Sequence, residues 1–168
     1  MTFQLKQLFH REGDTLPVDY EIPPQALSQI RGYRFDQPVH VTGTFRNRAG
    51  IVTLDLTVDC VLTAECDRCL ELFVRPYSFS FTHTVVLSVN RDNDEYIVAQ
   101  DAQLDVDEVA VTDLLLQLPT KLLCREDCKG ICNRCGTNLN LRTCTCDTRS
   151  LDPRMSVIQE IFNEFKEV

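Results

Sequence analysis

Residues 52–63 read VTLDLTVDCVLT, and this stretch decides the fold. Apolar side chains recur at every second position: Val52, Leu54, Leu56, Val58, Cys60 and Leu62. The positions between them are threonine or aspartate, apart from Val61. A two-residue period is typical of a strand with one buried face. We therefore predict a strand here, with Cys60 as a small buried hydrophobe on its inner face.

Two neighbouring runs share this period. Residues 39–46 place Val39, Val41 and Phe45 at odd positions, and residues 73–87 alternate aromatic and aliphatic side chains with serine and threonine. Residues 47–50 are predicted to turn the chain between the first two runs. Residues 38–88 thus indicate an antiparallel meander with one apolar face. Pro76 has no N–H to donate, which predicts an edge or strand-start position.

The flanking segments predict shorter elements. Phe3 and Leu5, and then residues 18–22, alternate with polar neighbours and predict two short strands before Pro23 and Pro24. The spacing of Val111, Leu114, Leu115 and Leu118 predicts an amphipathic helix that Asp105 or Asp107 caps and Pro119 ends.

The last residues predict another helix. Asp152 is a good N-cap and Pro153 suits the first helical position. One apolar stripe follows, which we expect to cover the sheet or to bind a partner: Met155, Ile158, Ile161, Phe162 and Phe165.

These elements predict an α+β fold. An antiparallel meander or partly closed sheet carries two or more helices, followed by a cysteine-rich, zinc-binding C-terminal segment. We expect a β-rich core domain over residues 1–120 that ends in a helix, the zinc-binding segment over 121–150, and the C-terminal amphipathic helix over 151–168. A chain of 168 residues with 43% hydrophobic content can bury a sizeable core.

The nine cysteines carry the chemistry. Six lie between Cys124 and Cys146 in the pattern C-x3-C-x3-C-x2-C-x8-C-x-C, and Cys66 and Cys69 form a C-x2-C pair at the turn between the second and third strands. No signal-peptide-like run and no 18-residue apolar stretch is present, so we expect a cytoplasmic protein without a membrane role. A reducing compartment and an odd number of cysteines argue against a disulfide framework.

Metal ligation accounts for this pattern in two ways. The division we favour gives Cys132, Cys135, Cys144 and Cys146 to a local zinc site, because closing a short loop costs little. It pairs Cys66 and Cys69 with Cys124 and Cys128 in a second site. The rival is a single zinc bound by Cys124, Cys128, Cys132 and Cys135, with the other cysteines as reduced thiols. The sequence leaves one or two ions open.

Other uses of the thiols fit less well. The Cys128, Cys132 and Cys135 spacing occurs in some iron–sulfur loops, but the barrel and substrate-binding signals of such enzymes are missing. Dithiol redox catalysis normally uses a C-x2-C motif at the beginning of a helix, whereas Cys66 and Cys69 lie in a hairpin turn. The histidines are also unremarkable as ligands: His10 and His40 lack ligand spacing, and His83 fits a satisfied core histidine.

The sequence shows no nucleophile–base constellation, phosphate-binding loop or pair of catalytic carboxylates, so we expect no enzyme and no small-molecule substrate. Charge points instead to a partner. Residues 121–154 hold seven basic and four acidic side chains, a net +3 that leaves −11 elsewhere in a chain of net charge −8. A zinc held by four thiolates adds −2 and largely cancels that local excess, so charge alone favours a basic protein partner. The basic side chains beside the cysteines are the candidate contacts: Lys121, Arg125, Lys129, Arg134 and Arg142.

Four motifs resemble those of the YceD-type large ribosomal RNA subunit accumulation proteins, and in the same order. They are CDRCL at 66–70, Leu118-Pro119 leading to Cys124, CKGICNRCGTNLN at 128–140, and Asp152-Pro153-Arg154. Asn133 is a departure, since relatives often carry proline there. The departure removes no ligand.

The resemblance implies a non-enzymatic factor that supports normal levels of large-subunit ribosomal RNA through processing or assembly. The implied partner is a precursor of the large ribosomal subunit, through its RNA or its proteins. The alternative is a thiol-redox or regulatory zinc protein unrelated to ribosomes.

Overall fold

The computed structural model describes residues 1–28, 30, 32–88 and 96–146. The chain divides into two compact units. The first, here called the sheet unit, comprises residues 1–65 and 72–122. The second comprises residues 66–71 and 123–168 and is here called the cysteine unit. The predicted C-terminal helix over 151–168 lies outside the described residues.

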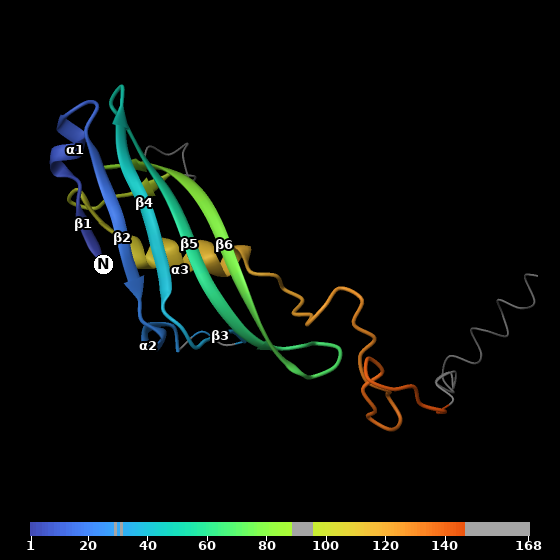
Figure 1. Ribbon diagram of the computed structural model, residues 1–168. Helices are drawn as coiled ribbons and strands as arrows, with labels where there is room; N and C mark the ends of the chain where they lie inside the picture. The colour runs from blue at the N-terminus through green and yellow to red at the C-terminus, as the bar shows by residue number, and fades with distance from the viewer. Residues whose placement is uncertain (29, 31, 89–95, 147–168) are drawn as a thin grey trace, which may run out of the picture. The chain divides into compact units, whose positions relative to one another are not determined.

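A six-stranded sheet forms the sheet unit, with the order β2-β4-β5-β6-β7 and β3 paired to β5 (Figure 1). Its antiparallel strands are β2 (Thr15–Ile22), β4 (Val39–Arg48), β5 (Ile51–Glu65) and β6 (Leu72–Val86). The two-residue strands β3 (Arg34–Phe35) and β7 (Ile97–Val98) are added to it, β7 in parallel with β6. The predicted meander and the α+β fold class are confirmed.

Strand β5 forms the centre of this sheet, as its sequence predicts. Its even-numbered side chains from Val52 to Ala64 are buried, and Cys60 among them is 4% exposed. Gly43 of β4 pairs with Leu56, and a Cβ atom at Gly43 would lie 2.3 Å from the carbonyl oxygen of Asp55. The close approach of these two strands therefore depends on glycine.

The turn between β4 and β5 is shorter than predicted. Asn47 and Arg48 belong to β4, and only Ala49 and Gly50 turn the chain, with φ angles of 52° and 81°. Positive φ at both central residues is typical of the two-residue type I′ turn, whose twist matches that of the strands. Asn47 is buried and donates from Nδ2 to the carbonyl of Leu8 at 2.7 Å, which explains why it is held in the strand.

The N-terminal residues differ in part from the prediction. Strand β1 (Thr2–Gln4) pairs with β8 (Gln103–Asp105) in a separate two-stranded sheet. Leu5 does not continue β1; it is buried and precedes helix α1 (Lys6–His10). Pro23 and Pro24 end β2 as predicted, because Pro24 begins helix α2 (Pro24–Leu27).

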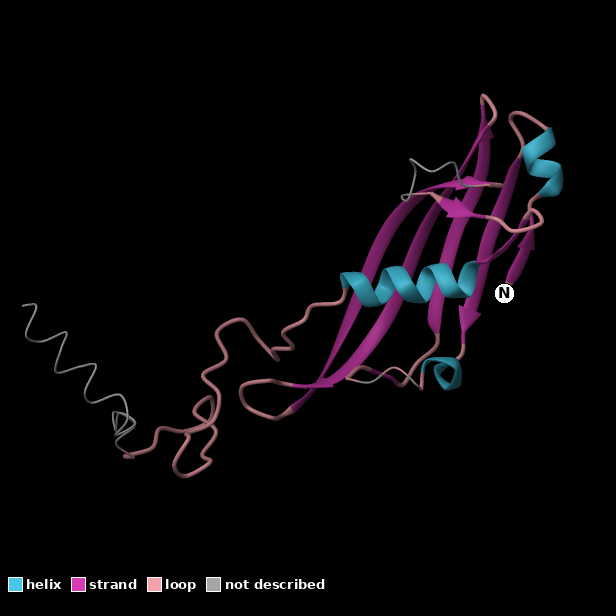
Figure 2. Cartoon of the chain, turned by 180° about the vertical axis from the view of Figure 1, so that it is seen from behind, coloured by secondary structure: helices cyan, strands magenta, loops and turns pink. Residues whose placement is uncertain are grey.

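Helix α3 (Val106–Gln117) lies across one face of the large sheet (Figure 2). The carboxylate of Asp105 caps it by accepting a hydrogen bond from the N–H of Asp107 at 3.1 Å, as the sequence indicates. Ala110 and Leu114 are fully buried against the sheet residues of the core. Within the described part of the chain, no helix combines the length and the apolar character that crossing a membrane requires.

Candidate metal centre

The cysteine unit contains two groups of four thiols. Site A consists of Cys66, Cys69, Cys124 and Cys128, and site B of Cys132, Cys135, Cys144 and Cys146. Within each group the sulfur atoms all lie within 4.8 Å of one another. The structure thus brings the thiols together in the two groups that the favoured division predicts. The single-site rival is not assembled, because Cys124 and Cys128 belong to one group and Cys132 and Cys135 to the other.

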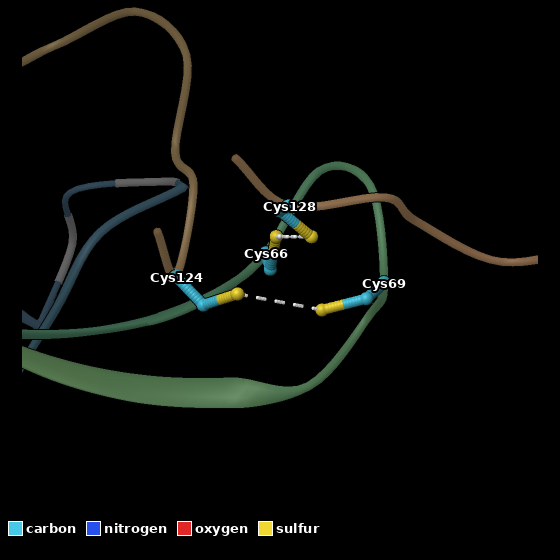
Figure 3. A group of neighbouring side chains, drawn as sticks. All are labelled: Cys66, Cys69, Cys124 and Cys128. Atoms are coloured by element: carbon cyan, nitrogen blue, oxygen red, sulfur yellow. Dashed lines mark hydrogen bonds between the residues drawn. The ribbon is translucent and has the colours of Figure 1, made fainter. Parts of the chain in front are cut away.

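The geometry of site A fits a tetrahedral zinc. The Sγ atoms of Cys66 and Cys128 lie 3.7 Å apart, and those of Cys69 and Cys124 lie 3.6 Å apart. Figure 3 shows the four side chains pointing toward one another, Cys66 and Cys69 from the β5–β6 loop and Cys124 and Cys128 from the later segment of the cysteine unit. Four sulfur atoms bound to zinc at 2.3 Å would be separated by about 3.8 Å. A disulfide needs about 2.05 Å, and none of the nine cysteines, all of which lie in the described part of the chain, forms one.

The two C-x2-C pairs form the same turn. In the first, the N–H of Cys66 donates to the carbonyl of Glu71, and the N–H of Leu70 donates to the carbonyl of Cys66. In the second, the N–H of Cys132 donates to the carbonyl of Thr137, and the N–H of Gly136 donates to the carbonyl of Cys132. The four nitrogen–oxygen distances are 2.9–3.0 Å. The repeated turn presents two thiols on one side, the arrangement of a zinc knuckle.

A left-handed residue follows the second cysteine of each knuckle. Leu70 after Cys69 has a φ of 59°, and Gly136 after Cys135 has a φ of 69°. Glycine adopts this conformation freely, whereas leucine is strained there. The first knuckle therefore stores backbone strain that the second avoids.

Groups around site A orient its ligands. The guanidinium of Arg68 donates to the carbonyl of Cys128 at 2.8 Å, and Nδ2 of Asn140 donates to the sulfur of Cys128 at 3.2 Å. Gly130, with a φ of 78°, lies against Arg68; a Cβ atom there would meet the Arg68 carbonyl oxygen at 2.9 Å. Such surrounding contacts hold metal ligands in place and tune them.

Site B is more open than site A. In site A, Cys66, Cys69 and Cys128 are buried and Cys124 is half-buried. In site B only Cys132 is buried, Cys144 and Cys146 are half-buried, and Cys135 is exposed. The hydroxyl of Thr137 lies 3.1 Å from the sulfur of Cys135. Solvent therefore reaches site B more readily.

The thiols of each site differ in how readily they ionise. Burial opposes ionisation of Cys66, but backbone N–H groups of the site outweigh it and lower its pKa to about 6. Burial and the neighbouring thiols raise the pKa of Cys124 to about 12. In site B, hydrogen bonds from Thr137 lower the pKa of Cys135 to about 6, and Cys135 in turn raises the pKa of Cys146 to about 12. A bound cation would displace the protons that remain.

The predicted contact residues lie on the surface. Arg125, Lys129, Arg134 and Arg142 belong to the cysteine unit and are exposed, and Lys121 is exposed near the end of the sheet unit. Arg125 forms an ion pair with Asp127 at 3.5 Å. His83, predicted to be a satisfied core histidine, is half-buried and shares a 2.6 Å hydrogen bond with Asp113.

Sequence reasoning did not identify Arg68, Asn140 or Thr137 as parts of these sites. Arg68 lies inside the C-x2-C tetrapeptide, and Thr137 and Asn140 follow Cys135 within GTNLN. The sequence signal that could have identified them is a polar residue within or directly after a C-x2-C motif. Such residues are close enough in sequence to reach the sulfur atoms or the backbone of the site.

A family model described as "Large ribosomal RNA subunit accumulation protein YceD" matches residues 54–162 of the chain. The match spans all eight clustered cysteines. An uncharacterized protein of Mycobacterium leprae is 24% identical over 153 residues, covering 83% of this chain and 67% of that protein. An uncharacterized protein of Mycobacterium tuberculosis H37Rv is 30% identical over 157 residues, covering 83% and 70%.

A maize protein named "Large ribosomal RNA subunit accumulation protein YCED homolog 1, chloroplastic" is 26% identical over 148 residues. The alignment covers 68% of this chain and half of the maize protein. No solved structure matches the chain.

Proposed function

Because the chain belongs to the YceD family of large ribosomal RNA subunit accumulation proteins, we propose that it supports the accumulation, processing or assembly of large-subunit ribosomal RNA. The family match over residues 54–162 is the observation that carries this proposal. Its partner would be a precursor of the large ribosomal subunit, through RNA or ribosomal protein. We further propose that it acts in the cytoplasm, as a binding factor and not as an enzyme.

Two structural zinc ions are part of the proposal. Four thiolates favour zinc over hard cations such as magnesium or calcium, which prefer oxygen ligands. In site A the ion would bind Cys66, Cys69, Cys124 and Cys128, and in site B Cys132, Cys135, Cys144 and Cys146. Zinc would hold together loops that bury few apolar side chains of their own, which is the role of a structural metal in small modules.

The contact surface would be the basic side chains beside the cysteines. Arg125, Lys129, Arg134 and Arg142 are exposed, and the Cys132–Cys135 knuckle of site B and the GTNLN turn lie between Lys129 and Arg142 in the sequence. Zinc bound at sites A and B would add about −4 of thiolate–metal charge in total. The arginines therefore keep the surface of this unit from becoming strongly acidic, and they offer donors to carboxylates or phosphates.

The rival function is thiol redox chemistry or zinc-dependent regulation away from ribosomes. Redox dithiols typically open a helix, whose N-terminus stabilises the thiolate. Both C-x2-C pairs of this chain lie instead in non-helical turns, and each faces two further thiols at metal-binding separation. These features favour the metal-binding interpretation.

Co-sedimentation with large-subunit precursors tests the proposal. We expect the chain to migrate with these particles, and the triple variant Arg125→Glu, Arg134→Glu, Arg142→Glu to migrate less. The matched control reverses three exposed charges on the sheet unit, Lys6, Arg11 and Arg48, and so changes the net charge equally. Absence of the unmodified chain from the particles, together with dithiol-dependent reductase activity of the purified protein, would sink the proposal.

A further inference from the structure

Strand β6 has one long edge that no described strand covers. Its other edge pairs with β5 from Leu72 to Val85, whereas β7 pairs only with Val85 and Val86. Residues 77–84 read YSFSFTHT and contain no lysine, arginine, aspartate or glutamate. Charged side chains, proline and bulges are the usual means by which proteins block such an edge. From Tyr77 to Thr84 this edge lacks lysine, arginine, acidic side chains and proline.

The register shows which backbone groups point outward. The carbonyl of Val86 accepts a hydrogen bond from the N–H of Ala99 at 2.8 Å and therefore points away from β5. Backbone groups alternate sides along a strand, so those of Ser78, Ser80, Thr82 and Thr84 point to the same free edge. All but Thr84, which is half-buried, have exposed side chains. Pro76 continues this series at one end, where a missing N–H costs no bond to β5.

The opposite edge of the sheet gives a comparison within the same molecule. Strand β2 is the terminal strand there, and it carries Pro17, Asp19 and Glu21, all exposed. Proline and charge discourage the addition of another strand. Of the two outer edges that the described strands β2 and β6 give the large sheet, the edge of β2 is therefore blocked by proline and charge, whereas the edge of β6 between Tyr77 and Thr84 is open to pairing.

Aromatic rings line the side of this edge that faces α3. Tyr77 and Phe79 are stacked with centroids 5.7 Å apart, and Phe79 and Phe81 follow at 6.4 Å. All three are only partly buried against the core. A strand added beside β6 would place every second side chain along these rings. Cationic side chains are attracted to such ring faces.

The end of this aromatic row is acidic. A pocket of about 680 Å³ lies beside His83 and is lined by Asp101, Glu108 and Asp113, with no lysine or arginine among its described lining residues. The sheet unit as a whole holds nine basic and sixteen acidic residues, a net charge of −7. This charge disfavours both RNA phosphates and a second copy of the same unit, and it favours a basic occupant.

We propose that the free edge of β6 between Tyr77 and Thr84 binds an extended, arginine- or lysine-rich segment of a protein partner, which is added to the sheet as a further strand. Backbone hydrogen bonds to Ser78, Ser80 and Thr82 hold the segment. Its basic side chains lie along the aromatic row and reach the acidic pocket. The inference names the class of protein partner within the proposed function, but its evidence lies in the sheet unit alone.

Fluorescence anisotropy of the purified chain with a labelled peptide tests this inference. The probe is a peptide of about ten residues in which arginine alternates with valine, enough to pair with Tyr77–Thr84. The control peptide carries glutamate in place of arginine. We expect the basic peptide to bind and the acidic one to fail. Ser80→Pro removes an outward N–H and should weaken binding about tenfold or more; Ser80→Ala keeps that N–H and should bind like the unmodified chain.

Two further measurements test the inference even if the Ser80→Pro variant does not fold. Hydrogen exchange of the unmodified chain should slow at the amides of Ser78, Ser80 and Thr82 when the basic peptide is added. The double variant Asp101→Asn, Glu108→Gln should weaken binding several-fold, because two acidic lining residues become neutral.

Unaltered exchange at these amides on peptide binding would overturn the inference, as would a folded Ser80→Pro chain that binds the basic peptide normally. Saturable binding of oligouridylate at this edge, or dimerisation that Ser80→Pro abolishes, would assign the edge to RNA or to a second copy and would also overturn it. Co-sedimentation with ribosomal precursors is a separate readout, so either hypothesis can fail without the other.

Discussion

The guanidinium of Arg68 donates a hydrogen bond to the backbone carbonyl of Cys128, with 2.8 Å between Nη1 and the oxygen. The N–H of Ile131 donates in return to the carbonyl of Arg68 at 3.0 Å. These two bonds join the β5–β6 loop to the segment that carries Cys124 and Cys128. They link the two halves of site A independently of any metal.

Arg68→Ala should therefore weaken zinc binding at site A while leaving site B unchanged. Loss of a contact that orients a ligand typically lowers metal affinity about 10–100-fold. A competitive chelator titration of the purified protein measures this change. Arg68→Lys is the matched control, because it keeps the charge but not the planar donor geometry and should recover only part of the affinity. Equal weakening at both sites would contradict the local role of Arg68.

The metal content of cysteine variants separates the two-site arrangement from its rival. We expect two zinc equivalents by elemental analysis of protein purified without added metal. Cys66→Ser and Cys144→Ser should each lose one equivalent, since each removes one ligand from a different group. Cys60→Ala should lose none, because Cys60 belongs to neither group. One equivalent in the unmodified protein that survives Cys66→Ser would support the single site of Cys124, Cys128, Cys132 and Cys135.

Two glycines with similar backbone conformations offer a paired test of site A. Gly130 and Gly136 have φ angles of 78° and 69°, but only at Gly130 would a Cβ atom collide, at 2.9 Å from the carbonyl oxygen of Arg68. Gly136→Ala should cost about 1 kcal/mol from left-handed backbone strain alone. Gly130→Ala adds the collision and should cost about 2–4 kcal/mol. The free energy of unfolding of the zinc-loaded protein measures both costs, and equal losses would disprove the predicted contact with Arg68.

The sheet could be predicted from sequence because its signal is local. Alternation in residues 52–63 identifies β5 and its buried face. The two-residue turn at Ala49 and Gly50 joins β5 directly to the preceding strand β4. The pairing of β1 with β8 was not predictable in this way. It joins residues about a hundred positions apart, such as Phe3 and Leu104, and neither three-residue strand has a distinctive pattern.

The candidate site divides along the same line. Loop closure and C-x2-C spacing favour the grouping of Cys132 and Cys135 with Cys144 and Cys146, because short loops restrict where each sulfur can go. The pairing of Cys66 and Cys69 with Cys124 and Cys128 closes a much longer loop, and the sequence left it open against the single-site rival. The hydrogen bonds from Arg68 and Asn140 to Cys128 depend on how separate segments pack together, which the spacing of cysteines in the sequence does not predict. The positive φ of Leu70 was also unpredictable, since leucine rarely adopts it.

Cys60 provides a pH-dependent prediction outside the two sites. Burial, followed by the nearby Asp59 carboxylate, raises the pKa of its thiol to about 11. The folded state favours the neutral thiol. The contribution of Cys60 to the free energy of unfolding is therefore complete below the thiol's pKa in the unfolded chain, about 8.5, and is lost as the pH rises through its folded-state pKa of about 11. Iodoacetamide at pH 8 should leave Cys60 unmodified in the folded, zinc-loaded protein and alkylate it after unfolding, as peptide mass mapping would show. Rapid alkylation in the folded state would contradict its burial.

Zinc release should occur in two phases because the two sites differ in exposure. Cys135 of site B is exposed, whereas Cys66 and Cys128 of site A are 0% and 1% exposed. The bonds from Arg68 and Asn140 further restrain Cys128. A chromogenic chelator should therefore remove one equivalent quickly, from site B, and the second more slowly. Cys144→Ser should abolish the fast phase and Cys66→Ser the slow one. If Cys66→Ser removed the fast phase instead, site A would be the labile site, and burial would not control release.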